Sequence, residues 1–204
     1  MRPIAWFCAA LLAPLSAAAA LKVGDHAPDF SLAAALGGGT FTFHLAEALK
    51  KGPVVLYFYP KSFTTGCTLE AHLFADATPR FQALEATVIG VSHDDIATQQ
   101  QFSKSECRDQ FAVAADAKSS VIRAYDVELA IVPGMASRVS YVIGQDGKVA
   151  AVYASGDPEG HVNATMKAVQ SLAGALLRAR QRCSHCALLP RTYRFASVRG
   201  ASLP

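Results

Sequence analysis

Cys67 is the side chain whose surroundings best suit a chemical reaction. It follows residues 60–66 (PKSFTTG), in a turn between an apolar segment and a predicted helix whose N-cap is Thr64 or Thr65. The thiol is expected in the first helical turn, where unpaired backbone N–H groups and the helix dipole stabilise a thiolate. Thiolate is the reactive form of cysteine. The alternative is a buried cysteine that acts only as a small hydrophobe.

Four apolar segments rich in β-branched and aromatic residues predict the strands that position this turn. Residues 54–59 (VVLYFY) end at Pro60 and are typical of a central strand buried on both faces. Residues 87–92, 139–144 and 149–154 have a similar composition. The last two are separated by residues 145–148, whose Asp146-Gly147 turn predicts a hairpin.

Helical spacing of apolar residues fills the intervals between these strands. It occurs before Pro79, again after Pro79, at residues 96–106 and at residues 162–177. Residues 25–30 predict an irregular loop, and Gly37-Gly38-Gly39 a turn before the first core strand. We therefore expect an α/β fold of thioredoxin-like order, with a mixed central sheet and helices on both faces.

The chain of 204 residues suits one globular domain with additions at both ends. Its 51% hydrophobic and 17% charged residues exclude a disordered chain. Residues 1–20 resemble a signal peptide, with Arg2, a short apolar run and the small residues Ala18 and Ala20 before Leu21. We expect cleavage, export to the periplasm and no stable membrane span afterwards, although an uncleaved anchor is the alternative.

The remaining chain divides into a predicted domain, residues 21–177, and a basic, loosely ordered tail, residues 178–204. Residues 21–175 hold 12 basic and 16 acidic side chains, whereas residues 176–204 hold six arginines and no acid. The net charge of +3 therefore arises in the tail and predicts no nucleic-acid partner.

After loss of Cys8 with the leader, four cysteines remain. In an oxidising compartment they form either a structural disulfide or a redox couple.

The segment PKSFTTGC resembles the peroxiredoxin motif PxxxTxxC through Pro60, Thr64 and Cys67. The resemblance is strongest to the bacterioferritin comigratory protein subgroup and extends from about Val23 to about Leu177. It implies a thiol peroxidase in which the Cys67 thiolate attacks a peroxide and becomes a sulfenic acid.

The resemblance also implies roles for neighbouring residues. Thr64 would donate a hydrogen bond to the peroxide, or serve only as a helix cap. Pro60 would shield the sulfur from water, or only end the strand. Arg138 would stand beside the sulfur and stabilise the charge that develops on the leaving oxygen. Glu70 could hold Arg138 by a bidentate bond, or lie on a solvated helix face.

Cys107 is the expected resolving cysteine, and here the sequence departs from its relatives. Many relatives place this cysteine five residues after the peroxidatic one, where this chain has His72, and others place it where Ser103 stands. Cys107 lies one helical turn beyond Ser103. Its bond to Cys67 could require the first helix to unwind locally. The alternative is an inert Cys107 and a one-cysteine mechanism with an external thiol.

Cys183 and Cys186 form a CxxC pair in the tail without the strand and helix of a thioredoxin site. No function, an accessory redox pair and a metal site all remain open for it. Further histidines lack ligand spacing and are interpreted as structural or surface groups: His26, His44, His93 and His161.

Together these observations predict an exported antioxidant peroxidase that reduces hydrogen peroxide and small organic hydroperoxides. We expect a thioredoxin-like dithiol donor, no metal, haem or flavin, and a monomer or weak homodimer. One alternative is an exported thioredoxin-like thiol-disulfide oxidoreductase, which would favour a second cysteine near Cys67. Another is a non-catalytic binding domain of the same fold, which would have no need of Cys67, Thr64 and Arg138 together.

Overall fold

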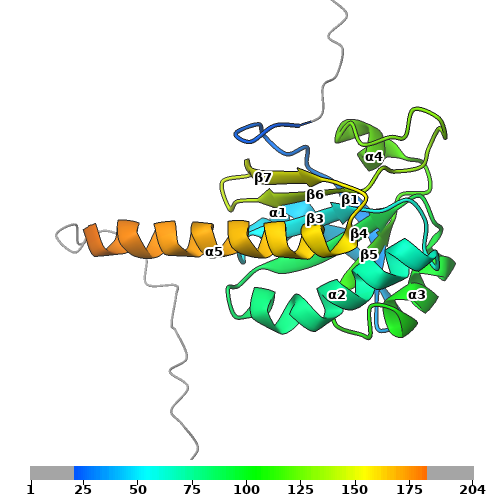
Figure 1. Ribbon diagram of the computed structural model, residues 1–204, viewed down its shortest axis with the longest axis horizontal. Coiled ribbons are helices and arrows are strands. Elements are labelled where there is room, and N and C mark those ends of the chain that lie inside the picture. Colours follow the sequence, from blue (N-terminus) through cyan, green and yellow to red (C-terminus); the bar gives the residue numbers. More distant parts are fainter. Residues whose placement is uncertain (1–20, 183–204) are drawn as a thin grey trace, which may run out of the picture.

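A seven-stranded sheet with helices on both faces runs through the computed structural model, which describes residues 21–182 (Figure 1). The expected leader and residues 183–204, with Cys183 and Cys186, lie outside the described residues. The strands are β1 (Ser31–Leu36), β2 (Gly39–His44), β3 (Val54–Phe58), β4 (Thr87–Ser92), β5 (Ala112–Ala115), β6 (Val139–Ile143) and β7 (Val149–Ala154). The helices are α1 (Leu45–Leu49), α2 (Thr65–Gln82), α3 (Ile96–Ser105), α4 (Ser120–Ala124) and α5 (Pro158–Arg182).

The sheet order is β2-β1-β5-β4-β3-β6-β7, which confirms β3 as a central strand. β3, β4 and β5 run parallel to one another, and the other strands pair antiparallel. The β6–β7 pairing confirms the predicted hairpin. Because parallel strands present their carboxyl ends at one edge, the loops that follow β3 and β4 lie side by side.

Alternation along β3 explains why its sequence is a continuous apolar run. Val54, Leu56 and Phe58 pack into a core with α1 and α4. Val55 and Tyr57 face the opposite way and pack with α2, α3 and α5. All five residues of β3 are buried, so neither face of the strand requires polar side chains.

The prediction of separate helices before and after Pro79 is wrong, because α2 runs unbroken from Thr65 to Gln82. Pro79 lies in the last turn, where its missing N–H affects only the end of the helix. The buried face of α2, which includes Phe74 and Phe81, also holds the helix against the sheet. The helix that carries Cys67 in its first turn is therefore continuous to Gln82.

The N-terminal strands, the short strand β5 and the short helices α1 and α4 were not predicted. Gly37 and Gly38, at φ 57° and 80°, form the turn between β1 and β2 rather than a turn before the first strand. β1 holds the alanine-rich run Ala33–Ala35, which carries no clear strand signal. Its place in the sheet depends on long-range pairing with β5.

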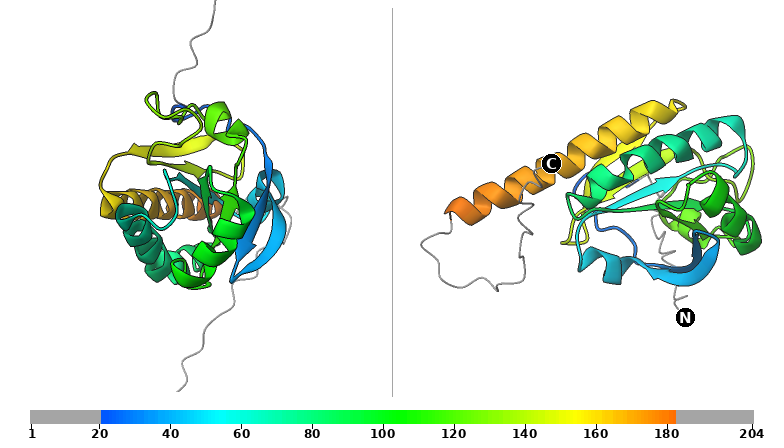
Figure 2. Two further views of the ribbon diagram at one scale, coloured as in Figure 1. Left: turned by 90° about the vertical axis from the view of Figure 1, so that its right-hand side faces the viewer. Right: turned by 90° about the horizontal axis from the view of Figure 1, so that it is seen from below.

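α5 begins beside the sheet and extends well past it, as Figure 1 and the right-hand view of Figure 2 show. The helix continues to Arg182, five residues beyond the predicted limit at Leu177. Its first turns pack into the core through Met166 and Val169, whereas Leu176 and Leu177 are exposed. Within residues 21–182, no helix combines the length and apolar character needed to span a membrane.

Candidate active site

Cys67 lies in the first turn of α2, at the carboxyl end of β3, as predicted. Thr64 is the N-cap by backbone conformation, and its carbonyl oxygen accepts the first helical hydrogen bond, from the Thr68 N–H at 2.8 Å. Cys67 is only 2% exposed. The sulfur is therefore close to the positive end of the helix dipole and largely shielded from water.

The loop that leads to Cys67 is fixed by a polar network at the carboxyl edge of the sheet. The Ser62 N–H donates to Asp94 Oδ2 at 2.7 Å, and the Tyr59 hydroxyl donates to Gln99 Oε1 at 2.8 Å. These bonds tie the loop to the end of β4 and to α3. Pro60, two residues after the end of β3, is half-buried.

Phe63 adopts a left-handed backbone conformation, with φ 62°, just before the helix. Such a conformation is unfavourable for a bulky residue and is typical of functional loops. The Phe63 ring packs edge-on against Phe102 of α3, with a centroid distance of 5.2 Å, yet 48% of the residue is exposed. An aromatic side chain therefore lies at the surface four residues before Cys67.

The Thr64 hydroxyl does not cap α2, so the interpretation of this side chain as a helix cap alone is wrong. It donates instead to the Lys61 carbonyl oxygen at 3.0 Å, within the loop. The oxygen of this exposed hydroxyl retains acceptor capacity, and the proton can turn to another acceptor.

Arg138 joins Cys67 to Glu70, although the three residues come from two distant parts of the chain. Arg138 Nη2 lies 3.4 Å from Cys67 Sγ, and Nη1 donates to Glu70 Oε2. Glu70 is fully buried, so its alternative assignment to a solvated helix face is wrong. A Cβ atom at Gly66 would lie 3.1 Å from Arg138 Nη2, which explains why a residue without a side chain suits that position.

Sequence reasoning missed His161 as a neighbour of this cluster. This residue of α5 is fully buried, and its Nδ1 lies 2.8 Å from Ser140 Oγ and 3.8 Å from Glu70 Oε1. Its separation from Glu70 is set by the packing of α5 on α2, so no local sequence signal reports it. Burial lowers the pKa of His161, whereas burial raises the pKa of Glu70 to about 8 despite the opposing effect of Arg138.

Cys107 is fully buried just after α3, in the same core cluster as Cys67, and both cysteines are free. Burial, reinforced by Glu106 and Asp109, raises the pKa of the Cys107 thiol. The two residues after it, Arg108 and Asp109, have left-handed backbones with φ 51° and 59°. Cys107 is thus a protonated thiol in a strained segment.

Comparison with known proteins agrees with this geometry. Residues 23–152 match the AhpC/TSA family. The chain is 33% identical over 150 residues to the chloroplastic peroxiredoxin Q of Oryza sativa subsp. japonica, which covers 73% of this chain and 67% of that protein. It is 32% identical over 157 residues to a putative peroxiredoxin of Mycobacterium tuberculosis, covering 74% of this chain and 99% of that protein.

This chain belongs to the peroxiredoxin family. The crystal structure of peroxidoxin BcpB from Mycobacterium tuberculosis superposes with a TM-score of 0.68 at 30% identity, over 74% of this chain and 98% of that one. A mutant PrxQ structure from Xylella fastidiosa gives a TM-score of 0.67 at 24% identity, over 76% and 99%. The thioredoxin-like fold and the predicted subgroup are confirmed. Membership makes this peroxiredoxin an oxidoreductase with a peroxide substrate and a thioredoxin-type reductant.

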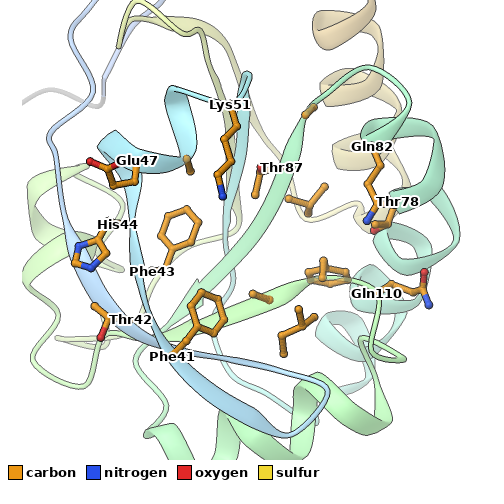
Figure 3. Close-up of a pocket in the computed structure, with 16 residues that line it drawn as sticks. Phe41, Thr42, Phe43, His44, Glu47, Lys51, Thr78, Gln82, Thr87 and Gln110 are labelled. Carbon is orange, nitrogen blue, oxygen red and sulfur yellow. The ribbon is translucent and has the colours of Figure 1, made fainter. Parts of the chain in front are cut away.

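A separate cavity of about 420 Å³ lies at the other end of the sheet, where β4 begins (Figure 3). Phe41, Phe43, Lys51 and Thr87 are among its lining residues, and Cys67, Arg138 and Glu70 are not. Among the described residues, no three His, Cys, Asp or Glu side chains lie together as metal ligands would. The cavity is therefore separate from the cluster of Cys67, Glu70 and Arg138.

Proposed function

We propose that this peroxiredoxin reduces hydrogen peroxide and small organic hydroperoxides at Cys67. The observation that carries the proposal is the 3.4 Å approach of Arg138 Nη2 to Cys67 Sγ at the start of α2. A fixed cation and a helix N-terminus both stabilise a thiolate there. The 2% exposure of Cys67 favours substrates with little bulk around the peroxide bond.

The proposed reaction begins with in-line attack of the Cys67 thiolate on one peroxide oxygen. The sulfur–oxygen bond forms as the oxygen–oxygen bond breaks, and the leaving oxygen takes a proton to become water or an alcohol. The Arg138 guanidinium can stabilise the negative charge on that oxygen before the proton arrives. Thr64 would donate its hydroxyl hydrogen to the bound peroxide, and Pro60 would limit access of water.

We assign the next step to Cys107, whose thiol would attack the Cys67 sulfenic acid to give a disulfide and water. Support comes from their shared core cluster and from the lack of another cysteine within residues 21–182. A buried, protonated Cys107 cannot attack without local opening. The left-handed residues Phe63 and Arg108 indicate where the backbone would relax on opening.

The disulfide would then be reduced by a thioredoxin-like dithiol donor in the periplasm. The signal-like composition of residues 1–20 supports this location. Fractionation of bacteria that express the full chain tests the location directly. Recovery of unprocessed chain in the cytosol would contradict it.

The peroxidase test is peroxide consumption coupled to thioredoxin and thioredoxin reductase, measured for the wild type, Cys67→Ser and Cys107→Ser. Cys67→Ser should abolish turnover. Cys107→Ser should still consume about one equivalent of peroxide per chain, because only the resolving step is lost. Peptide mapping after peroxide treatment should find a Cys67–Cys107 disulfide, and sulfenic acid alone would remove Cys107 from the mechanism.

Peroxide consumption, measured beside the reduction of insulin, separates the two alternatives. An oxidoreductase of thioredoxin type would reduce a protein disulfide such as that of insulin without consuming peroxide. The chain following Cys67 is Thr68-Leu69-Glu70, which offers no second cysteine at the helix start. A binding domain would show neither activity.

A further inference from the structure

The cavity at the start of β4 has the size of a small-molecule site, and the peroxidase reaction does not use it (Figure 3). Its volume of about 420 Å³ lies within the range of about 300–1,000 Å³ that is usual for ligand pockets. Residues from β2, α1, α2 and the first residues of β4 and β5 form its walls. Because β3 and β4 are parallel and Cys67 follows β3, the cavity and the reactive sulfur lie at opposite edges of the sheet.

Aromatic rings give the cavity an apolar wall. Phe41 and Phe43 alternate to the same face of β2, and Phe111 directly precedes β5. Phe43 and Phe111 are 6% and 4% exposed and belong to the two core clusters. Phe41 is 44% exposed, on a strand at the edge of the sheet. An apolar group that covers this ring removes its surface from water, which favours binding.

Lys51, just beyond α1, supplies a positive charge to the cavity. Figure 3 shows its side chain extending into the cavity. Among the described residues, its ammonium has no ion pair or hydrogen bond. Glu47, the only acid among the described residues that line the cavity, points away in the same view and is bonded to Lys50 Nζ at 2.5 Å. The lining therefore presents a cation that can accept an anionic ligand.

The other polar side chains of the lining do not compete for this cation. The Thr78 hydroxyl donates to the Phe74 carbonyl oxygen at 2.8 Å, and the remaining hydroxyls and amides are neutral. His44 Nδ1 lies 2.7 Å from Ser31 Oγ. Protonation of His44 would add positive charge, so it would also favour an anion. Charge and wall together favour a ligand with one anionic group and an apolar body.

We propose that this cavity binds an amphipathic carboxylate, with its anionic group at Lys51 and its apolar body against Phe41, Phe43 and Phe111. The carboxylate supplies a counter-ion for Lys51, and a charge-assisted hydrogen bond fixes the orientation of the ligand. A cationic ligand of the same length would meet Lys51 with like charge. This inference goes beyond the proposed peroxidase reaction and does not depend on it.

The test is isothermal titration calorimetry of the full chain with octanoate, and with octanol and octyltrimethylammonium as probes of the same chain length. The wild type should bind one octanoate per chain, octanol about tenfold more weakly and the cation not measurably. Lys51→Gln should weaken octanoate binding about tenfold, and Lys51→Arg should restore most of it. Lys167→Gln, at an exposed lysine of α5, is the matched control and should leave binding unchanged.

The apolar wall is tested with the same ligand. Phe41→Ser should weaken octanoate binding about tenfold, because the ring no longer covers the ligand. Leu177→Ser, at an exposed leucine of α5 outside the cavity, is its control and should bind like the wild type. Cys67→Ser should also bind like the wild type, so a failure of the proposed peroxidase activity would leave this result intact.

Four results would overturn the proposal. One is a wild type that binds no octanoate. Equal weakening in Lys51→Gln and Lys167→Gln would show a non-specific effect of charge, and equal affinity for octanol would remove the carboxylate from the site. Analytical ultracentrifugation covers the other occupant, because a wild-type dimer that dissociates in Phe41→Ser would assign the aromatic wall to a second copy of the chain.

Discussion

His72 Nε2 lies 2.9 Å from Glu106 Oε2, so α2 is joined to the residue that directly precedes Cys107. On the other side of Cys107, Arg108 Nη1 lies 2.9 Å from Asp76 Oδ1, one turn further along α2. These two contacts hold the Cys107 segment against the helix that carries Cys67. Each would resist the opening that disulfide formation requires.

Glu106→Gln is expected to accelerate formation of the Cys67–Cys107 disulfide after a pulse of peroxide. A partly exposed contact of this kind contributes about 0.2–1 kcal/mol, so the rate should rise by about 1.4- to fivefold. Rapid quenching with a thiol-blocking reagent, followed by mass spectrometry, measures the rate. Glu159→Gln, an exposed acid in the first turn of α5, is the control, and equal acceleration in both variants would contradict the role of the His72 contact.

Arg138→Lys is expected to slow the first reaction with peroxide on the order of 100-fold. The planar guanidinium contacts Cys67 and Glu70 through two different nitrogens, whereas a single ammonium cannot match both contacts. Stopped-flow kinetics with hydrogen peroxide measures the second-order rate constant. Arg123→Lys, at an exposed arginine paired with Glu128, should leave it unchanged. A rate near that of the wild type in Arg138→Lys would mean that charge alone suffices.

Thr64→Val is expected to reduce the rate constant for peroxide by about 10- to 100-fold, because the hydroxyl is lost as a donor to the substrate. The helix should remain intact, since this hydroxyl bonds to Lys61 and does not cap α2. Thr64→Ser retains the donor and should stay within a few-fold of the wild type. Circular dichroism checks that α2 is preserved, and a loss of helix in Thr64→Val would assign the effect to structure.

Glu70 should make folding less stable as pH rises. Burial raises its pKa from 4.5 to about 8. Between these values the unfolded chain releases the proton and the folded chain retains it, so the free energy of unfolding falls with pH across this window. The loss is on the order of 5 kcal/mol at most. Urea unfolding at pH 5 and pH 8 should show a smaller difference in Glu70→Gln than in the wild type; equal differences would place the titration elsewhere.

Local sequence signals predicted the elements that position the sulfur. The apolar run of β3, the strand-to-helix turn before Cys67 and the hairpin at Asp146-Gly147 each depend on neighbours in sequence, and the structure has all three. Pro79 misled the prediction because tertiary packing of α2 outweighs a weak helix break near its end. β1 was missed because its alanines pair with a strand about 80 residues away.

In the active-site cluster, only the residues that the family resemblance covers could be predicted. Arg138 and Glu70 came from the resemblance, and the structure brings both to Cys67. His161 and the Glu106 contact of His72 depend on how α5 and α3 pack against α2, which no spacing rule encodes. The roles of Pro60, Thr64 and Cys107 stay predictions.

Because Cys67 is deeply buried, its reaction rates with small and bulky reagents should differ according to how often the first turn of α2 opens. A small hydroperoxide needs only the narrow approach to a sulfur that is 2% exposed, whereas a bulky maleimide must wait until the first turn of α2 frays. The ratio of the two rates would then report how often the site opens. A change that loosens this turn should raise maleimide labelling while leaving peroxide consumption in the first turnover almost untouched.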